Sequence, residues 1–304
     1  MEYGRKNVDR LDELMSTIQK TDNIPTLPKI ISKITDLMDD DTFSVKYIGE
    51  LMTKDLSLSA RILKIVNSPF YGFSQRIYNL NHAIVLLGAN VLKSIVISTS
   101  VFTAMKESME GLWEHSLFCA FTAKYVARTL NKDKKRLISN GNKKKYMIDE
   151  DLVFSAALLH DIGKVIIATT FKNDFKNIIE TAKHNNISLI DIEYKNFNTS
   201  HDYLGYALIK EWHLPPSIYF PIKYHHNLVL ADEFKIETAI INLADFLTKS
   251  LGIGFSGSPY IEKLNGEVIK ILGIDIDFIR NIIEEIYSFK EELYIFDYLK
   301  TFNS

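Results

Sequence analysis

Apolar residues recur at spacings of three and four positions along most of this chain, and that period lines a single face of an α-helix. The clearest example is the segment 28–39, where Ile30, Ile34 and Leu37 fall on one face. In the first part of the chain the same pattern predicts helices over residues 28–39, 45–52, 55–66, 82–87 and 90–102.

Breaking and capping residues set the ends of these predicted helices. Pro69 forbids continuation of the helix over 55–66. Asn81 is placed to cap the helix over 82–87, and Gly88 is placed to end it. The segment 90–102 is rich in valine and isoleucine, so a strand is conceivable there, but its helical neighbours favour a buried helix.

The second part of the chain continues the helical pattern, with Pro, Gly, Asn or Asp at the boundaries. It predicts helices over 111–130, 151–169, 172–185, 201–212, 215–226 and 236–250, and two further amphipathic helices within 259–304. The expected fold is all-α, a multi-helix bundle preceded by a smaller helical subdomain. We expect a tail over 1–14, a first subdomain over 15–105, a second over 106–250 and a helical extension over 251–304.

Composition narrows the class of protein. The 304 residues are 46% hydrophobic and 24% charged, as in a folded globular chain, and the net charge of −2 creates no global attraction for nucleic acid or anionic membrane. Cys119 is the one cysteine, which excludes an internal disulfide framework. Neither a signal peptide nor an apolar run of roughly 20 residues is present. We therefore expect a cytoplasmic protein that binds neither nucleic acid nor membrane.

The segment 131–149 is locally basic. Its positive residues are Lys132, Lys134, Lys135, Arg136, Lys143, Lys144 and Lys145. Such a run could contact an acidic partner or a phosphate, but short charge blocks are usually solvated loops, and we favour a loop here.

The most informative stretch places His160, Asp161 and Lys164 inside an otherwise apolar helical pattern. A buried carboxylate costs several kcal/mol unless it is paired or bound to metal. One interpretation is an ion pair between Asp161 and Lys164, with His160 as a satisfied core residue. The other is a metal site, and this stretch alone does not separate the two.

Other residues of the same part favour the metal site. Histidines and one more aspartate with apolar neighbours occur on separate predicted helices, and the full set is His115, His160, Asp161, His201, His225, His226 and Asp245. Gly205, four residues after His201, would allow another helix to approach closely. A shared cluster explains these seven side chains more economically than seven unrelated buried polar groups. We expect the remaining histidines to be surface, structural or helix-end residues. They are His82, His184 and His213.

Imidazole and carboxylate ligands without a thiolate suit iron or manganese, with zinc or nickel as alternatives. Two ions bridged by Asp161 would each have two or three protein ligands and would leave room for an activated water. The expected cofactor is therefore one or two divalent transition-metal ions.

At these residues the sequence resembles the HDOD family (HD-related output domain) of the HD superfamily. The resemblance rests on motifs that follow one another over about residues 15–250. They are Ile24 to Pro28, Asp55 to Leu63, Val66 to Pro69, Leu80 to Gly88, Leu158 to Lys164, His201 to Gly205, Trp212 to Pro216 and His225-His226.

The resemblance implies a helical fold and a bacterial signalling role, and many HDOD proteins have lost catalysis. It also implies roles for single residues. His160 and Asp161 match the HD pair, the other five residues of the set match the remaining ligands, and Lys164 matches a lysine that assists at phosphate. In an active protein, Asp161 and Lys164 would be the catalytic residues.

Two departures separate the chain from the HD-GYP relatives that degrade cyclic-di-GMP. The double histidine continues into Asn227 to Asp232 rather than into a Gly-Tyr-Pro loop. Gly111 stands where those relatives use a glutamate. Both departures argue against that activity and against a three-metal site.

Two functions from different classes follow. The first is a regulatory or output module that binds metal and engages signalling proteins or a small phosphorylated ligand. The second is a metal-dependent phosphohydrolase acting on a nucleotide or phosphodiester. We favour the first because the family is mostly non-catalytic.

Overall fold

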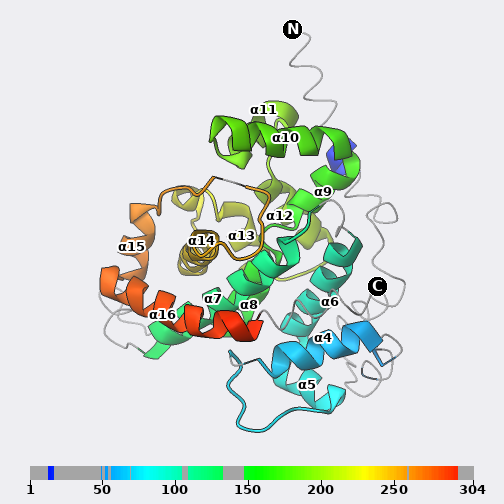
Figure 1. Ribbon diagram of the computed structural model, residues 1–304, viewed down its shortest axis with the longest axis vertical. Coiled ribbons are helices and arrows are strands. Elements are labelled where there is room, and N and C mark those ends of the chain that lie inside the picture. The colour runs from blue at the N-terminus through cyan, green and yellow to red at the C-terminus, as the bar shows by residue number, and fades with distance from the viewer. Residues whose placement is uncertain are drawn as a thin grey trace.

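The computed structural model describes residues 13–16, 49, 52–53, 56–68, 70–104, 109–132, 147–258 and 260–293. Within these residues every regular element is a helix, which confirms the all-α prediction (Figure 1). The predicted helix over 28–39 and most of the basic run over 131–149 lie outside the described residues, and so does nearly all of the predicted helix over 45–52.

The described part of the first subdomain consists of α4 (Leu56–Val66), α5 (Leu80–Leu87) and α6 (Ala89–Ala104). The valine-rich α6 is a helix, as predicted. The expected cap of α5 was wrong by two residues, because Asn79 has the extended backbone that a cap needs and its Oδ1 accepts from the His82 N–H at 3.1 Å. Gly88 ends α5 with a φ of +75°, as predicted.

Aromatic and charged contacts join this first part to the rest of the chain. Phe70 stacks on Phe121 of α7 (Leu112–Lys132) with ring centroids 4.4 Å apart. Arg128, also on α7, donates from Nη1 to the Phe70 carbonyl at 3.0 Å. Since α6 also packs on α8 (Glu150–Leu159), the two parts share one hydrophobic core.

The second part forms the bundle that carries the candidate site. Its remaining elements are α9 (Gly163–Thr170), α10 (Lys172–Asn185), α11 (Leu189–Phe197), α12 (His201–Glu211), α13 (Pro216–Tyr224), a 3₁₀ turn (Leu228–Leu230) and α14 (Lys235–Ser250). Pro216 occupies the first turn of α13, as its sequence position predicted. The sequence did not predict α11.

The helix predicted over 151–169 is interrupted, so that prediction was wrong at its centre. α8 ends at Leu159 and α9 begins at Gly163. The link between them is a tight turn in which the Ile162 N–H donates to the Leu159 carbonyl at 3.0 Å and the Lys164 N–H donates to the Asp161 carbonyl at 3.0 Å. The apolar pattern runs through the turn because both helices are buried, so periodicity alone gave no sign of the break.

The chain ends, as far as it is described, with α15 (Gly266–Leu272) and α16 (Ile276–Leu293), in agreement with the two predicted C-terminal helices. α15 packs on α14, and α16 contacts α7. The described residues of the connection between α14 and α15, 252–258 and 260–264, are the orange trace in Figure 1. This connection is called the covering segment below because it contacts Gly111, directly before α7, and Ser188, directly before α11.

The interrupted stretch Glu150–Thr170 is long and apolar enough to cross a membrane. However, 89% of its most apolar window is buried inside the protein. Such burial is what core helices show.

Candidate metal centre

Five separate elements bring the seven predicted ligands together in the second part of the chain. His115 lies on α7, His160 and Asp161 in the α8–α9 turn, His201 at the first position of α12, His225 and His226 directly after α13, and Asp245 on α14. All are buried except His226, which is partly exposed. The interior of this bundle therefore holds a cluster of imidazoles and carboxylates drawn from distant parts of the sequence.

One group of the cluster lies around the Oδ2 atom of Asp161. Asp161 Oδ2 lies 3.3 Å from His160 Nε2 and 3.7 Å from His115 Nε2. Asp245 Oδ1 lies 3.1 Å from the same His115 nitrogen and 3.6 Å from His160 Nε2. His115, His160 and Asp161 each point a ligand atom at a common centre.

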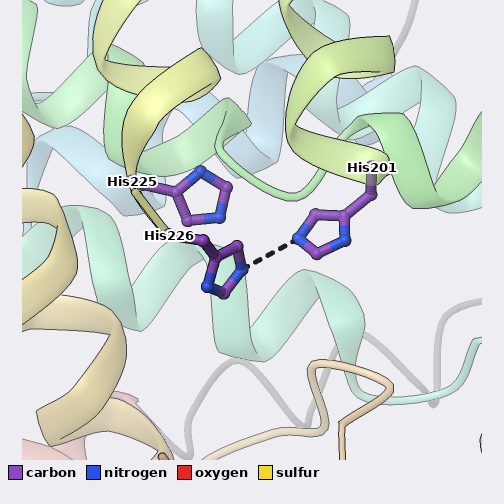
Figure 2. A group of neighbouring side chains, drawn as sticks. All are labelled: His201, His225 and His226. Atoms are coloured by element: carbon purple, nitrogen blue, oxygen red, sulfur yellow. Dashed lines mark hydrogen bonds between the residues drawn. The ribbon is translucent and has the colours of Figure 1, made fainter. Parts of the chain in front are cut away.

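His201, His225 and His226 form a second group (Figure 2). Figure 2 shows the two rings at the end of α13 facing the ring at the start of α12, with a hydrogen bond of 3.0 Å between His201 Nε2 and His226 Nε2. The rings of His225 and His226 are 4.1 Å apart between centroids. These residues supply three imidazole nitrogens within reach of one ion.

Asp161 lies between the two groups. While its Oδ2 faces His160, its Oδ1 lies 3.4 Å from His201 Nε2 and 2.6 Å from Lys164 Nζ. One carboxylate thus lies close to both groups, which is the arrangement expected of a bridging ligand. The ion pair with Lys164 is also present, so the two interpretations of this stretch are compatible.

The donor atoms fit a metal ion better than they fit one another. His115 Nε2, His160 Nε2, His225 Nε2 and Asp161 Oδ2 are buried and complete no hydrogen bond within the described residues. Ligand atoms about 2.0–2.2 Å from a shared ion lie roughly 3.0–3.6 Å apart, close to the spacings observed in the first group. Buried polar atoms without partners are costly, and a bound cation would satisfy all of them.

In three histidines a hydrogen bond at Nδ1 fixes the ring so that Nε2 points into the cluster. His160 Nδ1 donates to the Ala157 carbonyl at 2.7 Å, and His225 Nδ1 donates to the Ile222 carbonyl at 2.6 Å. In both rings Nε2 then points into the cluster, where it can bind a metal ion once it carries no proton.

Glu193 on α11 fixes the third ring. Its Oε2 lies 2.6 Å from His201 Nδ1 and accepts from the His201 backbone N–H at 2.9 Å. Burial raises the pKa of Glu193 to about 8 in spite of nearby positive charge from Lys164. Sequence reasoning missed Glu193 because it lies on the unpredicted α11, where one glutamate among polar residues carries no signal.

Two lysines balance the carboxylates: Lys164 is buried, and Lys249 is partly exposed. Lys164 Nζ pairs with Asp161, and Lys249 Nζ on α14 lies 2.6 Å from Asp245 Oδ2. Burial alone would lower the pKa of Lys249, but Asp245, Asp161 and Glu262 outweigh it and raise that pKa. Lys249 was also missed, because a lysine in the last turn of a helix is ordinary.

Burial and neighbouring charges shift the pKa values of the cluster residues. Burial alone would raise the pKa of Asp161, but His160 and Lys164 hold it well below its usual value. Burial alone would lower the pKa of His160, but Asp161 and Asp245 raise it to about 9. Burial, reinforced by the positive charge of Lys164, lowers the pKa of His201 to about 3. In the absence of metal, His160 is therefore the ring that carries the proton at neutral pH.

Two glycines permit the approach of the elements that carry these ligands. A Cβ on Gly163 would lie 1.9 Å from the His201 carbonyl oxygen and 2.6 Å from the Gly205 nitrogen. A Cβ on Gly205 would lie 3.2 Å from Ile222. The predicted close approach at Gly205 is confirmed, and its partner is the glycine that follows the His160-Asp161 pair.

The model of the HDOD domain matches residues 24–228, about two thirds of the chain. The chain belongs to the HDOD family.

Two solved structures and one curated protein are similar to this chain. The chain is 25% identical to an HDOD domain protein of unknown function from Geobacter sulfurreducens, covering 94% of this chain and 96% of that one with a TM-score of 0.65. A Shewanella amazonensis SB2B structure, provisionally named a metal-dependent phosphohydrolase, is 21% identical with a TM-score of 0.52, covering 93% of this chain and 99% of that one. An uncharacterised Treponema pallidum (strain Nichols) protein is 23% identical over 221 residues, 72% of this chain. The match spans about two fifths of that relative, 40% of its length.

The covering segment explains why this HDOD chain has glycine at position 111. Gly111 has a φ of +90°, and a Cβ there would lie 2.8 Å from the Phe255 nitrogen. The Phe255 N–H donates to the Gly111 carbonyl at 2.9 Å. Any side chain at this position would strain the backbone and would require the segment to move.

The other candidate residues lie away from the cluster or do not suit a ligand role. His82, His184 and His213 are exposed, consistent with the surface or helix-end roles predicted for them. Burial raises the pKa of the Cys119 thiol well above its usual value, with Asp245 and Asp161 adding to the shift. The Cys119 thiol is therefore protonated at neutral pH in the metal-free protein.

Proposed function

We propose that this HDOD protein is a regulatory module of bacterial signalling that binds one or two divalent transition-metal ions. The ligands would be His115, His160, Asp161 and Asp245 on one side and His201, His225 and His226 on the other, with Asp161 shared. The observation that carries the proposal is the inward convergence of these donors, several of them without a hydrogen-bond partner in the described residues. Iron and manganese are the ions we favour, with zinc and nickel as alternatives.

Burial of the cluster favours regulation over turnover. His115, His160, Asp161, His201 and His225 are each 1% exposed or less, and the covering segment contacts the helix that carries His115. A ligand must move protein to reach this interior. A site closed in this way suits a module whose conformation, and hence whose contact with a signalling partner, depends on what it binds.

A phosphohydrolase acting on a nucleotide or phosphodiester is the second candidate. Lys164 supports it, because its ammonium lies 2.6 Å from the shared carboxylate, where it could neutralise phosphate charge. The provisional name of the Shewanella amazonensis structure also points to this class. A bound metal ion would supply Lewis-acid activation of water, and Asp161 and Lys164 would then be the catalytic residues.

Elemental analysis after purification and after anaerobic loading with Fe²⁺ or Mn²⁺ tests the metal proposal. We expect one or two equivalents per chain in the wild type and a loss of binding in Asp161→Ala. Absence of metal from the loaded wild-type protein would refute the proposal.

A screen of nucleotides and phosphodiesters with the metal-loaded protein separates the two functions. Binding without turnover favours the regulatory module. Turnover that Asp161→Ala and Lys164→Met both abolish favours the enzyme. A partner protein captured only by the metal-loaded form would further support regulation.

A further inference from the structure

A cavity of about 380 Å³ lies beside α4 and the start of α5, on elements that carry none of the proposed metal ligands. It is called the α4–α5 cavity below. Small-molecule sites occupy about 300–1,000 Å³, so the cavity is large enough for a small ligand. None of the described residues that line it is charged. The lining residues that decide its chemistry are Ser59, Leu63, Tyr78, Asn79, Leu80 and Asn81.

The side chain of Asn81 is available to a ligand at the wall of this cavity. Asn79, rather than Asn81, caps α5. The Asn81 carboxamide makes no hydrogen bond with any other described residue. It lies directly beside Gly49, which also lines the cavity, since a Cβ on Gly49 would lie 1.7 Å from Asn81 Oδ1. The absence of a side chain at position 49 therefore leaves room for a carboxamide whose donor and acceptor are both unused.

Tyr78 adds an aromatic surface at the mouth of the cavity. It is 76% exposed although it lines the cavity. The Arg76 guanidinium lies over the ring, 5.5 Å from its centroid. The preceding residue is fixed by Asn67, whose Nδ2 donates to the Ile77 carbonyl at 2.7 Å and whose Oδ1 accepts from the Ile77 N–H at 2.7 Å. The backbone before Tyr78 is therefore held in place, and most of the ring is open to stacking.

Two leucines and a serine add to the lining. Leu63 and Leu80 contribute apolar surface. The Ser59 hydroxyl donates to the Met52 carbonyl at 2.9 Å, so its oxygen can still accept a hydrogen bond. A ligand that suits this lining is uncharged inside the cavity, has a flat apolar face, and offers a donor beside an acceptor to Asn81. An aminopurine has all three properties.

We propose that the α4–α5 cavity binds an adenine-type base, which stacks on Tyr78 and pairs with the carboxamide of Asn81. Asparagine pairs with the amino group and a ring nitrogen of adenine, and aromatic side chains stack on bases. Adenosine and adenine nucleotides share this base. The site goes beyond the proposed function, because no proposed metal ligand lines the cavity. It connects to the metal cluster through α6, which packs on both α5 and α8.

Isothermal titration of the full-length protein with adenosine tests the site. Tyr78→Ala removes the stacking surface and should weaken adenosine binding about tenfold. Asn81→Asp keeps the shape of the side chain but replaces its donor by a second acceptor, and it should also weaken binding about tenfold. Tyr194→Ala is the matched control, because Tyr194 is 51% exposed on α11, outside the cavity, and should leave the affinity unchanged.

Related ligands and a chelator define what the site reads. Purine riboside lacks the amino group of adenosine and should bind about tenfold more weakly to the wild type. AMP carries the same base as adenosine. An equal affinity for AMP would support the site with nucleotides among its ligands, and a weaker one would support it for uncharged nucleosides alone. A chelator should leave the adenosine affinity unchanged, so failure of the proposed metal site would not remove this binding.

The absence of adenosine binding to the wild type would overturn the proposal. So would binding that both Tyr78→Ala and Asn81→Asp retain, or purine riboside that binds as tightly as adenosine. Thermal melts check that each variant folds. An aspartate near the N-terminus of α5 is favourable, and Tyr78 is too exposed to support the core, so both variants should fold. If Asn81→Asp nevertheless unfolds, Tyr78→Ala and purine riboside decide the outcome.

Discussion

At the scale of single residues, metal binding depends on which atom of each side chain faces the cluster. His160, His201 and His225 are each turned by a hydrogen bond at Nδ1. Only His201 has a carboxylate in that role, because Glu193 holds it. Glu193 is therefore a positioning residue whose effect should differ from that of a purely structural core residue.

Replacement of Glu193 by glutamine should weaken metal binding by about 10–100-fold, the usual effect of removing an orienting partner. The unfolding temperature of the metal-free variant at pH 8 should not fall, since the substitution removes a buried carboxyl whose ionisation is unfavourable. Metal titration and thermal melts measure the two effects separately. Asp191→Asn, an exposed carboxylate on the same helix, is the control and should change neither. A parallel loss of stability and affinity in Glu193→Gln would point to a structural role only.

Metal binding should be pH-dependent because His160 carries a proton in the metal-free protein below about pH 9. A metal ion competes with that proton, so affinity should rise with pH towards 9, and binding at pH 7 should release protons. Titrations in two buffers with different ionisation enthalpies measure the release. No dependence on the buffer would contradict the assignment of His160.

The same groups set the stability of the metal-free protein. His160 and Glu193 have folded-state pKa values raised to about 9 and about 8, so each favours the folded state at low pH and loses that contribution as pH rises through those values. The free energy of unfolding should therefore decline between pH 6.5 and 9. Denaturant titrations across this window check the sign, and a rise in stability would contradict it.

The sequence identified the seven candidate ligands at this scale because charged and imidazole groups are conspicuous among apolar neighbours. Glu193 and Lys249 could not be found in the same way. Each is an ordinary charged residue in its local sequence. Its importance comes only from the tertiary contact that it makes.

At the scale of elements, the site depends on a close contact between the starts of α9 and α12. Gly163 makes this contact possible, since a Cβ there would lie 1.9 Å from the His201 carbonyl oxygen. The sequence predicted a close approach at Gly205 but not the turn that divides α8 from α9. It also missed α11, whose nine residues follow α10 so closely that the helical pattern gave no clear start.

Substitution of Gly163 by alanine should lower the free energy of unfolding by about 1–3 kcal/mol, because backbone must move to relieve the clash. It should also weaken metal binding, since the displaced backbone carries His201. Gly266→Ala is the matched control: Gly266 also begins a helix, but nothing lies within 4 Å of its added Cβ. Denaturant melts and metal titrations of both variants provide the comparison. Equal behaviour of the two variants would rule out the contact as a determinant of the site.

At the scale of the whole molecule, the cluster joins elements that the sequence separates by up to about 130 residues, from His115 on α7 to Asp245 on α14. Hydrophobic burial already unites α7, α8 and α14 in one core. The all-α fold could be predicted because helical periodicity is local. The approach of the ligands could be inferred only from their chemistry, since no pattern in one helix reports on another.

A metal ion bound to the folded state alone should stabilise the entire chain. At a free metal concentration 100 times its dissociation constant, the gain is about 2.7 kcal/mol for one site. Thermal melts with and without a chelator measure it. His115→Gln should abolish the metal-dependent gain, while His184→Gln, an exposed histidine outside the cluster, should retain it. Retention of the gain in His115→Gln would exclude that residue as a ligand.

The convergence of five histidines and two aspartates on bound metal is the central claim, and anomalous diffraction from crystals grown with Mn²⁺ or Fe²⁺ tests it most directly. We predict one or two anomalous peaks, each within bonding distance of ligand atoms from His115, His160 and Asp161 or from His201, His225 and His226. Strong diffraction at the absorption edge with no peak inside this cluster would contradict it.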